Sequence, residues 1–133
     1  MVAVRLRPAI IVLGDSLAQF AFGTNGQVGW AGLLSQAYQR RADCFNRGFQ
    51  GYTSKDIISY VLPDLFDVRE TLGSDDNTNG VVVGEAPVLF WTIILRANDA
   101  ALASGRQAVP LEEFGQNLDQ IISTIRYVRE PPA

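Results

Sequence analysis

The segment Pro87–Leu95 (PVLFWTIIL) constrains the fold more than any other part of the chain. It is apolar at every position except Thr92, and continuous runs of this kind are typical of parallel strands covered on both faces. A second, shorter apolar run at Ala9–Leu13 is closed by Gly14 and predicts another buried strand. The chain is therefore expected to build a sheet around two buried strands.

Helical patterns alternate with these strands. Apolar side chains recur at helical spacing over residues 30–38, and residues 111–128 form a longer stripe that begins just after Pro110. Proline is well accepted at the start of a helix, and the REPPA sequence at the end of the chain predicts where this helix stops. The stripe consists of Leu111, Phe114, Leu118, Ile121, Ile122, Ile125 and Val128.

The middle of the chain supplies a further strand and helix. Residues 42–52 begin as a short strand and end in a loop punctuated by glycines. The TSKD sequence at Thr53–Asp56 resembles a capping box with Asp in the Glu position. It predicts a helix over Ser54–Val61 that ends at Pro63.

The β-α-β-α-β-α order predicts one α/β domain over residues 1–133, a three-layer flavodoxin-like parallel sheet with helices on both faces. Residues 71–86 predict a surface loop with a small hairpin at Val81–Val83. The chain looks truncated after its third β-α unit, which leaves strand 87–95 at the sheet edge despite its interior-like composition. We expect a further C-terminal segment, a protein partner or another strand order to cover that edge.

Composition excludes several classes of function. The net charge of −3 comes from 14 acidic and 11 basic residues spread along the chain, so no nucleic acid partner is expected. No apolar run is long enough to span a membrane, and no secretory signal is evident, so we expect an intracellular protein, in the cytoplasm or an organelle such as the mitochondrion. With Cys44 as the only cysteine and no histidine, no disulfide, metal site or cofactor is implied. Core packing is the expected role of Trp30, Phe90, Trp91 and Phe114, and burial that of Cys44.

Polar loops follow the three predicted strands, at the edge where open parallel sheets bind their ligands. They carry Gly14-Asp15-Ser16, the sequence NRGFQG at residues 46–51, and Ala97-Asn98-Asp99. A serine hydroxyl, a glycine N–H and an asparagine amide are the groups that acyl transfer requires, namely an attacking oxygen and donors for an oxyanion. Each motif alone also fits an ordinary turn or cap.

The order and positions of these motifs resemble the GDSL, or SGNH, hydrolase family, and most of all its isoamyl-acetate-hydrolysing esterases. The resemblance implies a parallel sheet flanked by helices and a serine esterase for small acyl esters. By position it makes Ser16 the nucleophile, with its own N–H, the Gly51 N–H and the Asn98 side chain as the oxyanion hole, while Asp15 and Asp99 shape the loops. The matching stretches are VLGDSLAQF (12–20), GWAGLLSQAYQRRADCFNRGFQGYTSKD (29–56), ANDAAL (97–102) and VPLEEFGQNL (109–118).

Two departures from the family pattern bear on activity. The family's Asp-x-x-His block, which supplies the base, has no counterpart, since the chain contains no histidine and stops at Ala133, about where the fourth strand should begin. Arg96 stands where the family has the Gly of Gly-x-Asn-Asp, so it could occlude the acyl pocket, contact an anionic group, or extend into solvent. Lys55, the only lysine, could in principle replace the base. A lysine in a first helical turn is more often simply solvated.

Three hypotheses of function follow from these features. In the first, the chain is part of an ester hydrolase whose Ser16 site is nearly inactive alone, because removing the base of such a site costs about 10⁶-fold in turnover. In the second, the chain is a degenerate hydrolase kept as a non-catalytic accessory subunit, docked through the edge of strand 87–95. A hydrolase that uses Lys55 is a third, weaker hypothesis.

Overall fold

The structure is a computed structural model that describes residues 7–65, 87–101 and 105–129, with side chains described up to Arg126 in the last helix. The predicted loop at 71–86, with its hairpin at Val81–Val83, lies outside these residues.

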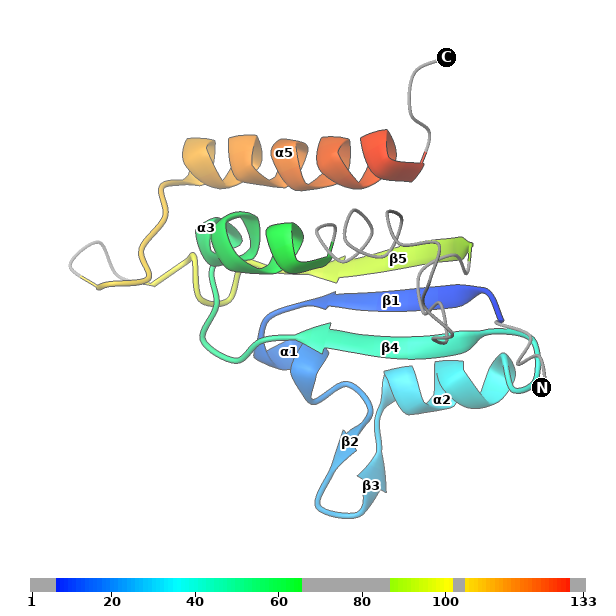
Figure 1. The fold of residues 1–133 in the computed structure, drawn as a ribbon. Helices are drawn as coiled ribbons and strands as arrows, with labels where there is room; N and C mark the ends of the chain where they lie inside the picture. The colour runs from blue at the N-terminus through cyan, green and yellow to red at the C-terminus, as the bar shows by residue number, and fades with distance from the viewer. Residues whose placement is uncertain (1–6, 66–86, 102–104, 130–133) are drawn as a thin grey trace.

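The central feature is a sheet of three parallel strands in the order β4-β1-β5. The strands are β1 (Ala9–Gly14), β4 (Asp43–Gly48) and β5 (Val88–Ile94). β1 pairs in parallel with both neighbours, with Gly14 opposite Gly48 on one side and Ile94 on the other. All three arrowheads therefore point to the same edge of the sheet (Figure 1). This arrangement confirms the predicted flavodoxin-like α/β fold.

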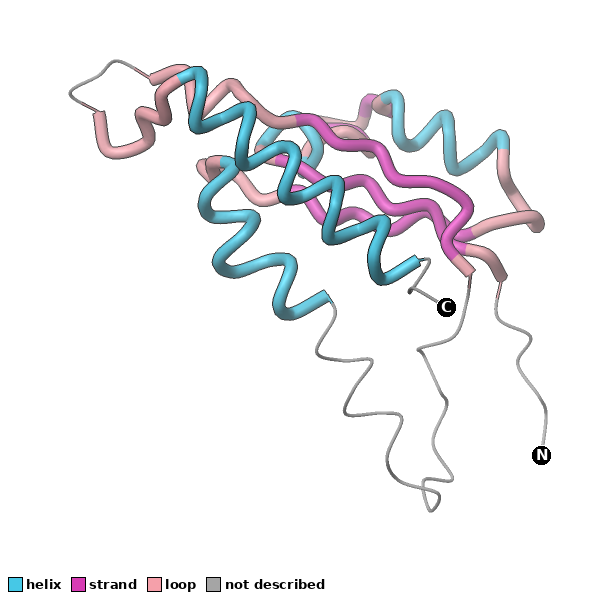
Figure 2. Tube along the Cα trace, turned by 90° about the horizontal axis from the view of Figure 1, so that it is seen from above, coloured by secondary structure: helices cyan, strands magenta, loops and turns pink. Residues whose placement is uncertain are grey.

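Helices cover both faces of the sheet (Figure 1). One face carries α1 (Ser16–Gln19) and α2 (Trp30–Ala37). The other carries a helical segment made of α3 (Ser54–Asp56) and the π-helix η1 (Ile57–Val61). The long helix α5 (Leu111–Arg129) lies on the same face, and the view from above shows it running over the sheet beside that segment (Figure 2).

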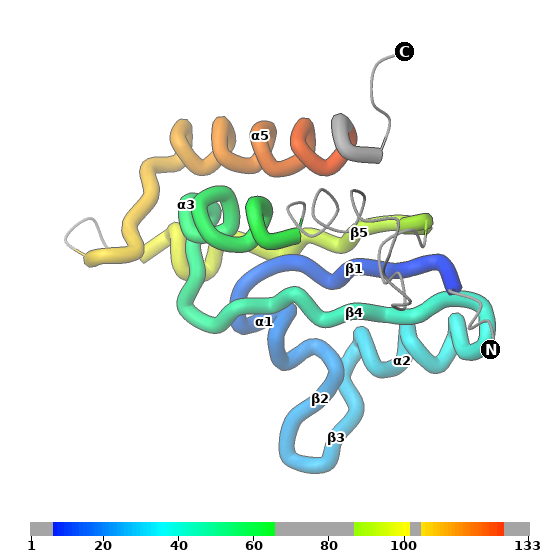
Figure 3. Tube along the Cα trace, in the orientation of Figure 1, coloured from blue at the N-terminus to red at the C-terminus, as the bar shows by residue number. Residues whose placement is uncertain are grey.

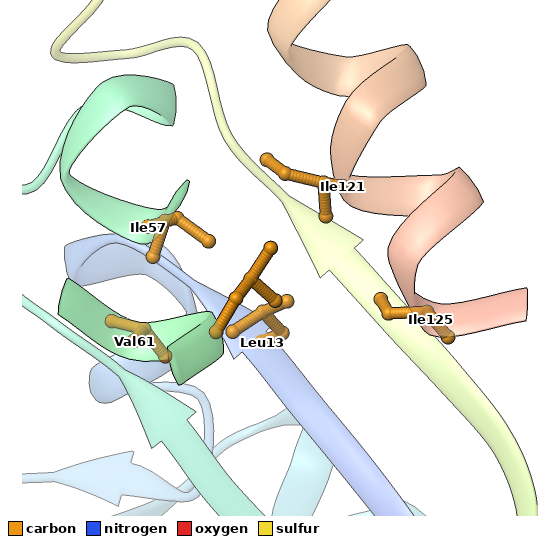
Figure 4. Packing of buried hydrophobic residues seen from close by; sticks show 6 residues of the cluster. Leu13, Ile57, Val61, Ile121 and Ile125 are labelled. Atoms are coloured by element: carbon orange, nitrogen blue, oxygen red, sulfur yellow. The ribbon is translucent and has the colours of Figure 1, made fainter. Parts of the chain in front are cut away.

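The core is organised around β1, whose six residues are all buried. Successive strand residues point to opposite faces. Leu13 therefore packs against Ile57, Val61, Ile121 and Ile125 from the α3 and α5 side, as Figure 4 shows. On the opposite face, Val12 packs against small residues, namely Ala18, Ala21 and Ala31. These alanines let α1 and α2 lie close to the strand.

The strand β5 has interior-like composition and an edge position. Within the described part of the chain it pairs only with β1, and none of its side chains is fully buried. Leu89 is 41% exposed. The expectation that this strand lies at the sheet edge therefore agrees with the described residues.

Helix α2 confirms the predicted helix but not its predicted inner face. Ala31 is its buried residue, whereas Trp30 and Leu33 are 40% and 56% exposed. The prediction that Trp30 packs in the core is thus wrong. The reason is that small residues of α2 face inward. The Ala31 N–H bonds to the Ala21 carbonyl, and a Cβ at Gly32 would collide with the Val28 side chain. Phe90, Trp91 and Phe114 are half-buried.

The helix that starts at Ser54 does not end at Pro63, as the sequence suggested. Its predicted capping box is present, with Thr53 and Asp56 each bonding the other's backbone N–H. The chain then stays helical to Leu65, the last residue described there. The Leu62 N–H bonds back to Ile57, five residues earlier. This wider turn accommodates a proline that lacks an N–H and would crowd the carbonyl four residues before it.

A small hairpin between α1 and α2, seen along the chain in Figure 3, was missed by the sequence interpretation. Its strands are β2 (Gly23–Thr24) and β3 (Gln27–Val28). Asn25 and Gly26 connect them with φ of 51° and 79°. Positive φ at both central residues is what the Asn-Gly dipeptide favours in a two-residue hairpin turn. That dipeptide was the available signal.

No helix in the described ranges is both long enough and apolar enough to cross a membrane.

Candidate active site

The first site loop joins β1 directly to α1. Asp15 is fully buried, and its Oδ1 accepts the Leu17 N–H at 2.9 Å, which caps the short helix. The Asp15 N–H donates to the Ile94 carbonyl at 3.2 Å. Gly14 lies so close to that carbonyl that a Cβ there would overlap it. The loop is therefore held against the end of β5.

Ser16 is the first residue of α1 and is half-buried. Within the described part of the chain, its hydroxyl and its backbone N–H donate to no acceptor. The first N–H groups of a helix have no partner inside the helix. Ser16 thus presents an oxygen and an N–H donor from the same residue.

The second loop, after β4, is bonded to the first. The Asn46 side chain donates to the Gln19 carbonyl and accepts the Gly48 N–H, both at 2.8 Å. The Phe49 N–H donates to the Gly14 carbonyl at 2.9 Å. A Cβ on Gly48 would overlap the Gln19 backbone. Glycine at this position is what permits the two loops to approach so closely.

Gly51, at the end of the second loop, is fixed by the residues around it. Its φ of +82° lies in the region that favours glycine. Its carbonyl accepts a hydrogen bond from Gln107 Nε2 at 2.6 Å, and the next carbonyl, of Tyr52, accepts one from Asn98 Nδ2 at 2.8 Å. The Gly51 N–H donates to no described acceptor. The second and third loops are therefore joined at Gly51 and Tyr52.

Asp99 connects the third loop to two helices. It is 1% exposed, and its carboxyl accepts from the Ser54 N–H at 2.9 Å and the Ser54 hydroxyl at 2.5 Å. Asn117 of α5 donates to the same hydroxyl at 2.9 Å. The Asp99 carboxyl thus accepts an N–H that lies 45 residues away in sequence, a bond that an ordinary cap or turn within its own loop would not make. Sequence reasoning also missed Ser54, Gln107 and Asn117, whose partners only the fold reveals.

Arg96 leaves the end of β5 with an unusual backbone. Its φ is +126°, a region that L-residues with a Cβ rarely adopt. Its guanidinium carbon lies 5.0 Å from the centre of the Phe114 ring, and its Nη1 is buried with no hydrogen-bond partner. Extension into solvent was one of the alternatives expected for Arg96, and this nitrogen does not extend into solvent.

Other candidate groups have simpler explanations. Lys55 Nζ lies 2.7 Å from Glu113 Oε1, an exposed ion pair that ties α3 to α5 and gives Lys55 a partner other than Ser16. Burial raises the pKa of the half-buried Cys44 thiol, an effect that a hydrogen bond to Ser35 opposes and the charge of Asp43 reinforces. A raised pKa leaves less of the reactive thiolate at neutral pH. In the described ranges, no group of three metal-ligating side chains could hold an ion.

Removing the Asp99 carboxyl is expected to destabilise the protein, because the buried Ser54 N–H and hydroxyl would lose their acceptor. Asp99→Ala should lower the free energy of unfolding by about 3 kcal/mol, measured by urea denaturation. Asp119 of α5 is exposed, and Asp119→Ala should change the free energy of unfolding by no more than about 0.5 kcal/mol. Equal effects of the two substitutions would contradict the assigned role of Asp99.

The backbone of Arg96 predicts an unusual benefit of glycine. Arg96→Gly and Arg96→Ala both remove the guanidinium, but only glycine adopts a φ of +126° without strain. Arg96→Gly should therefore be more stable than Arg96→Ala by about 1 kcal/mol, in the same unfolding measurement. If alanine proves equal or better, the backbone at this position is not strained.

The chain is similar in sequence to several curated esterases. No family model matches the chain. The isoamyl acetate-hydrolyzing esterase 1 homolog of Bos taurus is 37% identical over 126 residues, which are 93% of this chain and 44% of that protein. A GDSL esterase/lipase of Arabidopsis thaliana is 34% identical over 91% of this chain and 44% of its own length. The isoamyl acetate-hydrolyzing esterase of Saccharomyces cerevisiae is 33% identical over 87% and 44%, respectively.

A solved structure extends the likeness to the fold. The SGNH-hydrolase family esterase AlinE4 superposes with a TM-score of 0.55 at 17% sequence identity, covering 97% of this chain and 58% of that one. This chain spans less than half the length of the curated relatives named above. Its sequence and its fold together place the chain in the GDSL, or SGNH, hydrolase family.

Proposed function

We propose that this chain carries the nucleophile and the oxyanion-binding groups of a serine ester hydrolase that acts on small acyl esters. The observation that supports this most directly is the bonding of three loops at one edge of the sheet. Gly14 joins the first loop to the second through Phe49, and Asn98 joins the third to the second through Tyr52. Ser16, Gly51 and Asn98 all belong to this bonded set.

In the proposed reaction, Ser16 Oγ attacks the ester carbonyl and the carbonyl oxygen becomes an oxyanion. Three donors would stabilise that oxyanion, namely the Ser16 N–H, the Gly51 N–H and the Asn98 amide. Asn98 Nδ2 gives one hydrogen to the Tyr52 carbonyl and keeps a second. Donors fixed in advance are effective because they need little rearrangement as charge develops.

Residues around these groups act by positioning them. Asp15 caps α1 and so fixes the backbone that carries the Ser16 N–H. Gln107 holds the Gly51 carbonyl, and Asp99 holds the Asn98 loop to the start of α3. We propose these three as positioning residues, since their bonds go to the loops and not to a reacting atom.

The proton of Ser16 needs an acceptor that these 133 residues do not supply as a histidine. We propose that the base comes from outside this sequence and that the chain alone turns over slowly. Removing the members of a serine triad leaves about 10³- to 10⁴-fold acceleration over water, from the oxyanion hole and binding. Ser16 itself contributes little until a base is present.

Added imidazole tests this proposal by replacing the base. In buffer alone, wild type and Ser16→Ala should hydrolyse p-nitrophenyl acetate at similar slow rates, because an unactivated serine adds little. With rising imidazole, the rate should rise more steeply for wild type than for Ser16→Ala, after subtraction of hydrolysis by imidazole alone.

Ser123 lies exposed on α5 and provides the matched control. Ser123→Ala should respond to imidazole as wild type does. Identical rates of wild type and Ser16→Ala at every imidazole concentration would refute a nucleophilic role for Ser16.

The edge strand favours a second candidate function. β5 pairs only with β1 in the described residues and has half-buried side chains, as in a sheet that continues into a partner. We propose as the alternative a non-catalytic accessory subunit docked at this edge. This alternative predicts no dependence on Ser16 at any imidazole concentration, so the same measurement separates the two functions.

A further inference from the structure

Arg96 combines three features that its neighbours do not explain. Its backbone has a φ of +126°, its guanidinium lies over the Phe114 ring, and its Nη1 is buried with no hydrogen-bond partner. Strained backbone and unpaired buried donors are unfavourable, and both concentrate at functional sites. We propose that Arg96 binds a carboxylate of the ligand, so that the preferred esters are half-esters of dicarboxylic acids. This inference rests on the proposed ester site at Ser16.

The charge of Arg96 is not balanced by an acidic neighbour in the described part of the chain. The ion pairs found there are Arg7–Asp43 and Lys55–Glu113. Asp99 is the acidic residue nearest in sequence, and its carboxyl bonds Ser54 instead. Arg96 Nη1 therefore lacks an acceptor that an anionic group of a ligand would supply.

The position of Arg96 suits a group attached to an ester at Ser16. The Ile94 carbonyl accepts the Asp15 N–H, so the loop that carries Arg96 and the start of α1 at Ser16 leave the same sheet edge. Asn98, a proposed oxyanion donor, follows Arg96 by two residues. A short acyl chain that ends in a carboxylate would extend from the attacked carbonyl toward this guanidinium.

The chemistry of the site favours a carboxylate. A planar guanidinium offers paired N–H groups that match the two oxygens of a carboxylate. Its contact with the Phe114 ring, 5.0 Å from the guanidinium carbon to the ring centre, restricts the guanidinium before a ligand arrives.

Binding of a matched pair of esters tests the inference on the 133-residue chain. Monomethyl succinate carries one carboxylate, and dimethyl succinate is its neutral counterpart. Each is titrated while the amide signals of Ser16 and Gly51 are followed by nuclear magnetic resonance. Wild type should bind the half-ester about tenfold more tightly than the diester, as one charge-assisted hydrogen-bonding pair implies.

The variants assign that preference to a single side chain. Arg96→Ala and Arg96→Gly should both bind the two esters with equal affinity, although they differ in backbone strain. Arg126 is exposed on α5, and Arg126→Ala should keep the full preference. A change seen in both Arg96 variants and not in Arg126→Ala therefore comes from the Arg96 guanidinium.

Three results would overturn the inference, and they distinguish its failure from failure of the ester site. If both esters shift the Ser16 and Gly51 signals with equal affinity in wild type, or if the preference survives in both Arg96 variants, Arg96 does not bind the carboxylate while the ester site stands. If neither ester shifts these signals, the ester site itself fails, and the carboxylate inference fails with it.

Discussion

The parallel pairing of β1 with both β4 and β5 is the constraint on which the site depends. Because all three strands run the same way, the loops that follow them leave the sheet at one edge. Burial of every β1 residue fixes that strand between two layers of helices. Leu13 on one face and Val12 on the other thus anchor the strand that presents Asp15 and Ser16.

Bringing loops to one edge does not yet make a site, and short-range polar contacts complete it. The first and second loops are joined through Asn46 and Phe49, and the third is held by Asn98 and Asp99. Most of these bonds use a backbone group on one side, which fixes the course of the chain itself. The proposed donors at Ser16 and Gly51 are left free of described partners because neighbouring groups hold their loops.

The fold was largely predictable because its signals are local. Continuous apolar runs identified β1 and β5, the TSKD sequence identified the start of α3, and helical spacing identified α2 and α5. The errors arose at positions where packing between elements, and not the local sequence, decides which side chain is buried and where a helix ends. Ala31 faces inward in place of Trp30 because α2 lies close to its neighbours, and a π-helical turn carries the chain past Pro63. The β2-β3 hairpin had a local signal, Asn25-Gly26, that was overlooked.

The site was predictable only in part. Motif order placed Ser16, Gly51 and Asn98 in three loops, and their roles remain proposals. The partners of Asp99 and Gly51 could not be predicted, since Ser54 and Gln107 meet them only in the folded chain, as Asn117 meets Ser54. Arg96 is the clearest case, because its sequence position marked it as unusual, and only the structure shows its positive φ and its unpaired buried nitrogen.

A crystal structure of the chain with an alkyl boronic acid would show whether Ser16 is the nucleophile and whether Gly51 and Asn98 bind the same oxyanion. A boronic acid bonded to a serine oxygen mimics the tetrahedral intermediate of ester hydrolysis. We expect boron bonded to Ser16 Oγ, with one boronate oxygen about 2.7–3.1 Å from the Gly51 nitrogen and from Asn98 Nδ2. A boronate on another residue, or one whose oxygens lie away from both donors, would contradict it.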